Sequence, residues 1–102
     1  MSIEQQPITT STATLFTSSG TNAITAIYLM NDHSNTVTVQ LHVVTDGDTI
    51  GNSNKIIKNL QIAAGDTFVI DTEKLLLDNN DKIQATADVD SVCYSTISYI
   101  GV

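Results

Sequence analysis

The chain has 102 residues, of which 41% are hydrophobic and 15% charged, and its formal net charge is −7. All four basic residues are lysines, which argues against nucleic acid and against an anionic membrane surface as partners, because both require clustered positive charge. The single cysteine forms no internal disulfide framework, and no apolar run approaches the ~18 residues that span a bilayer. The polar start of the chain predicts no signal peptide.

The composition favours an all-β fold. Ile, Val and Thr make up 35 of the 102 residues. Their β-branched side chains are stiff and suit a pleated, half-buried surface better than a helix. Turn residues recur every 8–12 residues, which is typical of a two-layer antiparallel β-sandwich. We therefore predict such a sandwich with about eight short strands, either immunoglobulin-like or a jelly roll.

In chain order, residues 1–8 are polar, contain the only proline and predict an extended N-terminal arm. Residues 9–102 are expected to form one β-sandwich domain. The run 73–77 is ambiguous between a helical turn capped by Thr72 and a short strand, and its shortness favours the strand. The other strands are predicted at 9–18, 24–31, 36–44, 55–62, 67–71, 83–87 and 92–100.

Two strands are apolar on both of their faces. Residues 36–44 alternate cleanly between apolar and polar side chains, as a strand with one wet face should. Segments 24–30 and 13–16 do not, and a two-layer sandwich has no third layer to cover their second face. We predict that another subunit or another protein covers this surface. The interface candidates are Leu15, Phe16, Tyr28 and Met30.

The sequence supplies no catalytic constellation. His42 falls on the polar face of its strand and is expected to be exposed, and His33 lies in a turn. Neither has a partner at zinc-ligand spacing, and no nucleophile or phosphate-binding motif is present. Cys93, on the last strand, is interpreted as a small hydrophobic residue. We expect no enzyme activity, no catalytic residues and no cofactor.

Calcium is the strongest metal hypothesis, because hard cations bind carboxylate and carbonyl oxygens in loops. Two loops carry suitable residues, but neither has the spacing of an EF-hand, and Asp and Asn are also ordinary turn residues. We therefore interpret the Asp and Asn residues of both loops as turn residues and predict no metal site. The weak calcium candidates are Asp46, Asp48, Asp78 and Asp81.

A pattern over residues 24–102 resembles small virion structural proteins of tailed bacteriophages. It consists of a strand that ends in Asn (27–31), an alternating strand (36–41), a Gly-Asp-Thr turn (65–67), a Lys-Leu run (74–77), an Asp-x-Ile-x-Ala strand (81–85) and a closing Ser-Tyr-Ile (98–100). The resemblance implies a non-enzymatic β-sandwich that is located in the virion. It transfers no site residues.

The functional prediction is a virion subunit that assembles on the particle, as a capsid decoration or cement protein or as a neck or tail component. Its expected partners are copies of itself and other virion proteins of the capsid or tail. Strong acidity agrees with this, because it keeps free subunits apart before they dock. The alternative is a host-attachment module that binds a carbohydrate or a calcium-dependent ligand. A small hydrolase is the third and weakest reading.

Overall fold

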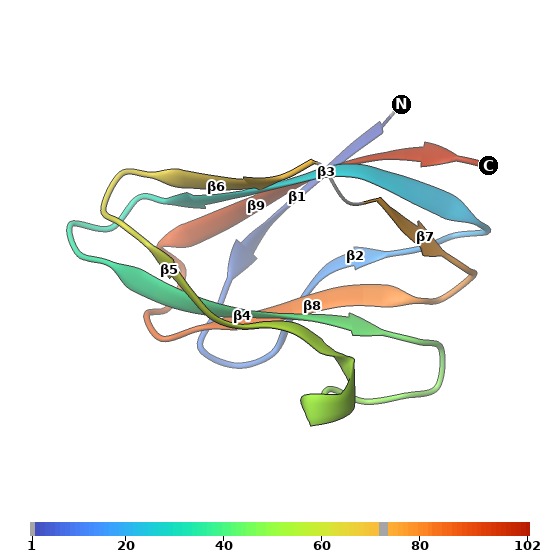
Figure 1. Ribbon diagram of the computed structural model, residues 1–102, viewed down its shortest axis with the longest axis horizontal. Coiled ribbons are helices and arrows are strands. Elements are labelled where there is room, and N and C mark those ends of the chain that lie inside the picture. Colours follow the sequence, from blue (N-terminus) through green and yellow to red (C-terminus); the bar gives the residue numbers. More distant parts are fainter. Residues whose placement is uncertain (1, 72–73) are drawn as a thin grey trace.

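The β-branched segments fold into two antiparallel sheets that pack face to face, in a computed structural model that describes residues 2–71 and 74–102 (Figure 1). The β-sandwich prediction is confirmed. A 3-10 turn at Asn52–Asn54 precedes the fifth strand. The strands are β1 (Ser2–Ile8), β2 (Ala13–Thr17), β3 (Asn22–Asn31), β4 (Val37–Val44), β5 (Lys55–Ile62), β6 (Thr67–Ile70), β7 (Leu75–Leu77), β8 (Lys82–Ala87) and β9 (Cys93–Gly101).

The strand order is that of a jelly roll. One sheet runs β1-β9-β3-β6, and the other runs β2-β8-β4-β5. β6 pairs with residues 27–30 of β3 and β7 pairs with residues 22–24, so the two act as one interrupted strand. Counted this way, the first strand pairs with the last, the second with the seventh, the third with the sixth and the fourth with the fifth. This folded-over hairpin is the eight-stranded jelly roll rather than the immunoglobulin order.

The N-terminal segment is extended, as expected, but it is not a separate arm. Ser2 to Ile8 pair in unbroken antiparallel register with Tyr99 to Cys93 of β9. Pro7 is tolerated because β1 lies at the edge of its sheet, where one side of the strand needs no ladder hydrogen bond. The segment therefore belongs to the sandwich.

The ambiguous run at 73–77 contains a strand, β7, at Leu75–Leu77. The proposed helix cap Thr72, together with Glu73, lies outside the described residues. Leu75 and Leu77 share the inward face with Ile24 and Asn22, whereas Leu76 points outward. Period-two alternation thus holds even in this three-residue element.

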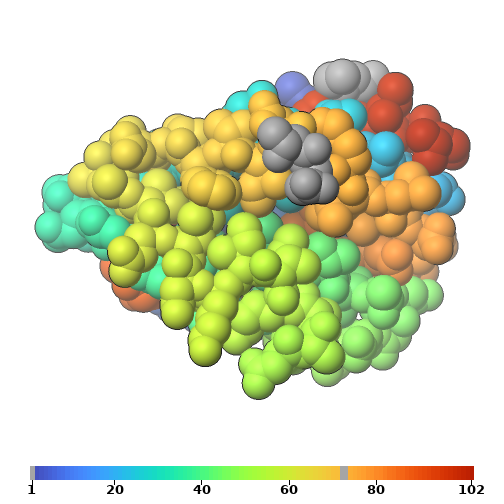
Figure 2. All heavy atoms as spheres, in the orientation of Figure 1, coloured from blue at the N-terminus to red at the C-terminus, as the bar shows by residue number. Residues whose placement is uncertain are grey.

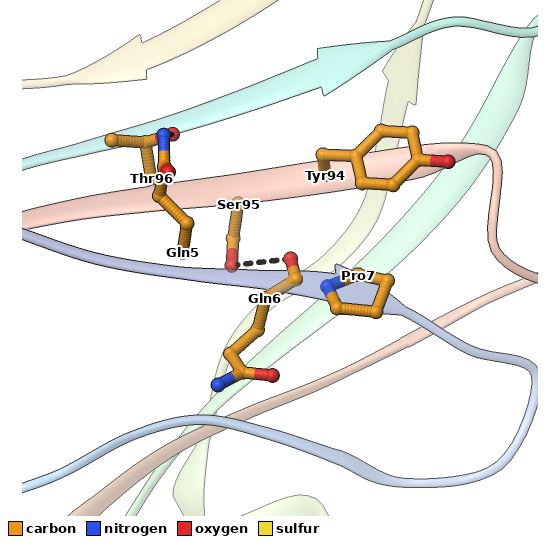
Figure 3. Close-up of a pocket in the computed structure, with 6 residues that line it drawn as sticks. All are labelled: Gln5, Gln6, Pro7, Tyr94, Ser95 and Thr96. Carbon is orange, nitrogen blue, oxygen red and sulfur yellow. Dashed lines mark hydrogen bonds between the residues drawn. The ribbon is translucent and has the colours of Figure 1, made fainter.

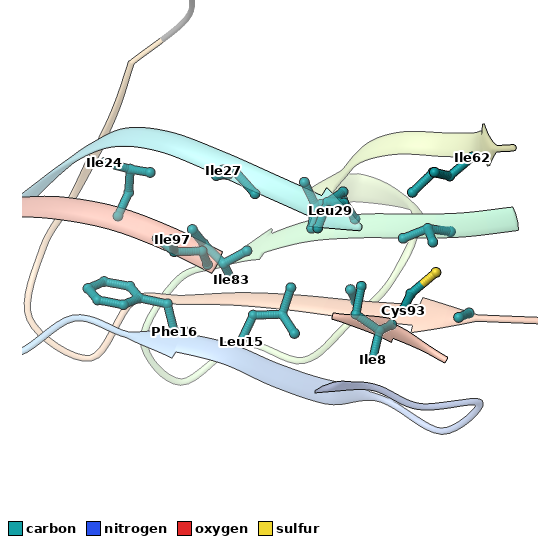
Figure 4. Close-up of a cluster of buried hydrophobic side chains, with 14 of the residues drawn as sticks. Ile8, Leu15, Phe16, Ile24, Ile27, Leu29, Ile62, Ile83, Cys93 and Ile97 are labelled. Carbon is teal, nitrogen blue, oxygen red and sulfur yellow. The ribbon is translucent and has the colours of Figure 1, made fainter. Parts of the chain in front are cut away.

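The core lies between the two sheets (Figure 4). Alternate residues of the strands fill it, because successive side chains of a strand point to opposite faces. The rings of Phe16 and Tyr99 pack at 4.6 Å between centroids with a tilt of 56°, which joins the two sheets. The fully buried apolar side chains include Ile8, Leu15, Ile27, Leu29, Val37, Val39, Leu41, Ile83 and Ile97.

A β-bulge corrects two of the interface candidates. Thr14 pairs with Gln84 of β8, but Phe16 pairs with the adjacent Ile83, so β2 carries an extra residue at Leu15. An extra residue lets two consecutive side chains point to the same face. Leu15 and Phe16 are both buried in the chain's own core and are not available at its surface.

Cys93 lies on the inward face of β9, fully buried opposite Ile8 and Asn31. Burial, and to a smaller extent the charge of Asp88, raise the pKa of its thiol. Because the thiolate is the reactive form, we expect Ellman's reagent to label the folded protein at pH 8 at least 100-fold more slowly than the chain in guanidinium chloride. Equal rates in the two conditions would contradict the buried position.

Candidate functional site

The outer surface of the five-stranded sheet is the most distinctive surface of the molecule. Cross-strand partners in an antiparallel sheet lie on the same side, so the register assigns fourteen residues to this surface, which we call the outer face. None of them is charged, in a chain with eleven acidic and four basic residues. The outer face comprises Ile3, Gln5, Pro7, Ala23, Ala26, Tyr28, Met30, Thr67, Val69, Leu76, Tyr94, Thr96, Ser98 and Ile100.

Large exposed hydrophobic side chains gather on the outer face. Among the described residues nine such side chains are exposed, and six of them lie here. Leu76 and Ile3 are 67% and 63% exposed, and the others are Tyr28, Val69, Tyr94 and Ile100. Soluble monomers rarely expose large contiguous apolar patches, and those that do use them for binding.

The register orders these side chains into rows that cross the strands. At one end, Pro7, Tyr94 and Met30 are successive cross-strand neighbours, and Tyr28 lies beside Val69 in the next row. At the other end Ala23 lies between Ile100 and Leu76, its partners on β9 and β7.

Polar but uncharged side chains separate the two ends. Gln5 donates a hydrogen bond from Nε2 to Oγ1 of Thr96 at 3.2 Å, and Ser98 accepts one from Oγ1 of Thr25 at 2.8 Å. A surface that contains tyrosine and methionine but no charged residue is typical of the buried centre of protein interfaces.

The predicted interface residues Tyr28 and Met30 both lie on the outer face, as the two-faced apolar pattern of 24–30 required. The sequence reasoning missed the other exposed hydrophobic residues of this face, which are Ile3, Val69, Leu76, Tyr94 and Ile100. They come from β1, β6, β7 and β9, and only the strand pairing brings them beside one another. The sequence signal that could have indicated this surface is the absence of charged residues at positions 94, 96, 98 and 100, which alternate along the last strand.

The outer side of the four-stranded sheet differs. Thr38, Gln40, Gln84 and Thr86 make it polar, in agreement with the alternation predicted for 36–44. The loop that carries the 3-10 turn lies beneath this sheet in Figure 1. Only one of the two sheets therefore presents an uncharged apolar surface.

His42 is buried, not exposed as expected. Its side chain is on the polar face of β4, but only 2% of it is accessible. Ile50 and Gly51 of the loop that follows β4 line a small hollow together with His42. In the described part of the chain its Nδ1 has no hydrogen-bond partner. The prediction failed because a loop covers the strand from outside, which alternation along the strand cannot reveal.

Burial, and then the positive charge of Lys55, lower the pKa of His42 below its ordinary value of 6.5. The unfolded chain therefore takes up a proton first as the pH falls, so stability is full above about pH 6.5 and decreases below it. We expect the free energy of unfolding to fall between pH 7.5 and 5.5, and His42→Gln to remove most of that decrease. Urea unfolding at both pH values measures it. The control is His33→Gln, and an unchanged slope in His42→Gln would contradict the assignment.

The four calcium candidates lie in two loops that the fold brings together. Asp81 accepts a hydrogen bond from the backbone N–H of Asp46 at 3.0 Å and another from that of Asp78 at 2.9 Å. Both oxygens of this carboxylate thus bind the backbone and join the loops. Asp48 accepts from the N–H of Thr49. Within residues 2–71 and 74–102 no three His, Cys, Asp or Glu side chains form a group suited to a metal ion.

A shallow hollow of about 310 Å³ lies between β1 and β9 (Figure 3). Tyr94 and Pro7 contribute apolar surface, and Gln5 and Thr96 contribute polar atoms. Beneath it, Oγ of Ser95 donates a hydrogen bond to the carbonyl of Gln6 at 2.9 Å, which ties the two strands together.

No protein-family model, curated protein or solved structure matches the chain. The part of the chain that the structure describes has no helix long and apolar enough to cross a membrane.

Proposed function

We propose that the chain is a non-enzymatic virion structural protein of a tailed bacteriophage. It assembles on the particle through the outer face, as a capsid decoration or cement subunit or as a neck or tail component. The observation that carries the proposal is the uncharged outer face with six large exposed hydrophobic side chains. The jelly roll agrees with it, because this fold recurs in viral capsids, although a fold alone does not define a function.

The size of the outer face suits a stable interface. The molecule measures 38 × 28 × 20 Å between Cα positions, and the two layers stack along the intermediate direction in Figure 1. Each broad face is therefore close to the ~800 Å² per partner of a standard interface. None of the fourteen residues of the outer face is acidic, so the net negative charge of the chain keeps free subunits soluble without placing a carboxylate among these docking residues.

Quantitative mass spectrometry of gradient-purified phage particles tests the proposal. We expect the chain at a constant copy number per particle that salt washing does not reduce. Its absence from particles, with the protein found only in the lysate of infected cells, would overturn the proposal. Immunogold labelling of the same particles then separates head from neck and tail.

A second candidate function is glycan binding for host attachment. The hollow beside Tyr94 favours it, because an exposed aromatic ring next to the amide of Gln5 and the hydroxyl of Thr96 suits a sugar's apolar face and hydroxyl groups (Figure 3). A glycan array, probed with and without calcium, tests this candidate. Binding that Tyr94→Ala abolishes would support it, and an array without signal would exclude it.

A further inference from the structure

An apolar cavity of about 310 Å³ opens between the two sheets at one edge of the sandwich. Ile56 and Ile57 of β5 form one wall, and Phe68, Ile70 and Leu75 of β6 and β7 form the facing wall. Every lining residue within the part of the chain that the structure describes is hydrophobic. In Figure 2 the atoms around β5 (yellow-green) and β6 (yellow) lie next to each other on the side toward the viewer.

The cavity is a place where this core is incomplete. Phe68 faces inward beside Leu29 in the register, yet it is 38% exposed, and Ile56 is 48% exposed. Protein interiors are normally packed without voids of this size. Two register shifts between β4 and β5 make this edge irregular. With the outer face and the C-terminal Val102, these two side chains account for all nine exposed large hydrophobic residues of the described chain.

Positive charge lies beside the cavity, in a protein of net charge −7. Ile56 belongs both to the cavity wall and to a neighbouring surface hollow that Lys55, Lys58 and Asn52 line. Lys55 donates a hydrogen bond from Nζ to Oδ1 of Asn52 at 3.2 Å. Lys58 is exposed and adjoins the same hollow. An apolar cavity with lysines beside it is complementary to an alkyl chain that ends in an anionic group.

We propose that this cavity binds a medium-chain fatty acid, with the alkyl chain between the sheets and the carboxylate at Lys58. The volume is about twice that of a 150 Å³ cavity that accommodates benzene, which suits a chain of roughly ten carbons. It also falls at the lower end of the range of small-molecule sites. The inference is independent of the proposed virion role.

A peptide strand added at this edge fits less well. Strand addition requires a regular edge with unpaired backbone groups. The pairing of β5 is interrupted by its register shifts, and lysines and bulges are features that protect edges from such pairing. Among residues 2–71 and 74–102, the cavity wall also presents no polar side chain to a peptide backbone.

Titration of the 102-residue protein with sodium decanoate, followed by calorimetry and by NMR of the isoleucine methyl groups, tests the proposal. We expect a Kd on the order of 10 µM for one site. The shifted methyl signals should be those of Ile56, Ile57 and Ile70. No binding at 1 mM decanoate, or shifts confined to outer-face residues such as Ile3 and Ile100, would overturn it.

Matched variants separate the two parts of the site. Lys58→Glu should weaken decanoate binding about tenfold and leave binding of the uncharged decan-1-ol unchanged. Lys82→Glu, the same charge change on β8, should have no effect on either ligand. Leu75→Trp, which fills the cavity, should abolish binding of both, with its melting curve showing that it folds. Equal decanoate affinity in the wild type and in Lys58→Glu would overturn the carboxylate assignment.

Discussion

Under the proposed virion function, Tyr28→Lys is expected to weaken docking of the chain on the phage particle at least 100-fold, which corresponds to about 3 kcal/mol. Tyr28 lies in the interior of the outer face, between Thr96 of β9 and Val69 of β6. A lysine there would be desolvated without an anionic partner among the fourteen described residues of this face, and an unpaired buried charge costs several kcal/mol. Binding of purified protein to phage particles grown without it measures the effect.

The matched control is Gln84→Lys, which places the same charge on the polar outer side of the other sheet. This variant should dock like the wild type. Tyr28 is 41% exposed, so its replacement should change the melting temperature by only a few degrees and leave the fold intact. Full docking of Tyr28→Lys, or equal loss in both variants, would show that the outer face is not the docking surface.

The strands could be predicted from the sequence because side chains alternate along them. The expected strand at 55–62 coincides with β5, and the alternation over 36–44 places Val37 and Val39 in the core. The outward position of Tyr28 and Met30 follows from the same rule. Each of these predictions depends only on residues that are close in the chain.

The features that were missed depend on contacts between distant residues. The order of the jelly roll rests on pairs such as Ser2 with Tyr99, which no local pattern specifies. The bulge at Leu15 is visible only against its partner strand β8. The cover over His42 comes from a loop, and the apolar cavity arises where β5 and β6 diverge. The outer face is formed by residues of five strands, and only the pairing register shows that they share one surface.

Asn31 shows how one buried polar residue holds several of these distant segments together. Its side chain is fully buried at the end of β3. Nδ2 donates hydrogen bonds to the carbonyls of Asn35 at 2.9 Å and Ile62 at 2.8 Å, and Oδ1 accepts one from the N–H of His33 at 2.8 Å. The amide thereby joins the turn after β3 to the end of β5. Both N–H donors of the amide and one of the two lone pairs of its oxygen are therefore used.

Asn31→Asp is expected to lower the free energy of unfolding by about 3–5 kcal/mol at pH 7, out of the 5–15 kcal/mol typical of a domain. The side chains of Asn and Asp have nearly the same shape, but a carboxylate has no N–H to donate to the carbonyls of Asn35 and Ile62. It also places a buried negative charge next to these carbonyl oxygens. Protonation restores one donor, so the loss should shrink as the pH falls. Urea unfolding at pH 7 and pH 4.5 measures both effects.

The control for Asn31→Asp is Asn59→Asp, which makes the same chemical change at an exposed position of β5. It should cost no more than about 0.5 kcal/mol, because surface changes away from packed features are usually that small. Equal losses in the two variants would mean that net charge, not the buried amide, sets the cost. A larger loss in Asn31→Asp that shrinks at low pH would instead trace it to the two carbonyls, because only a buried carboxyl group that lacks donors behaves in this way.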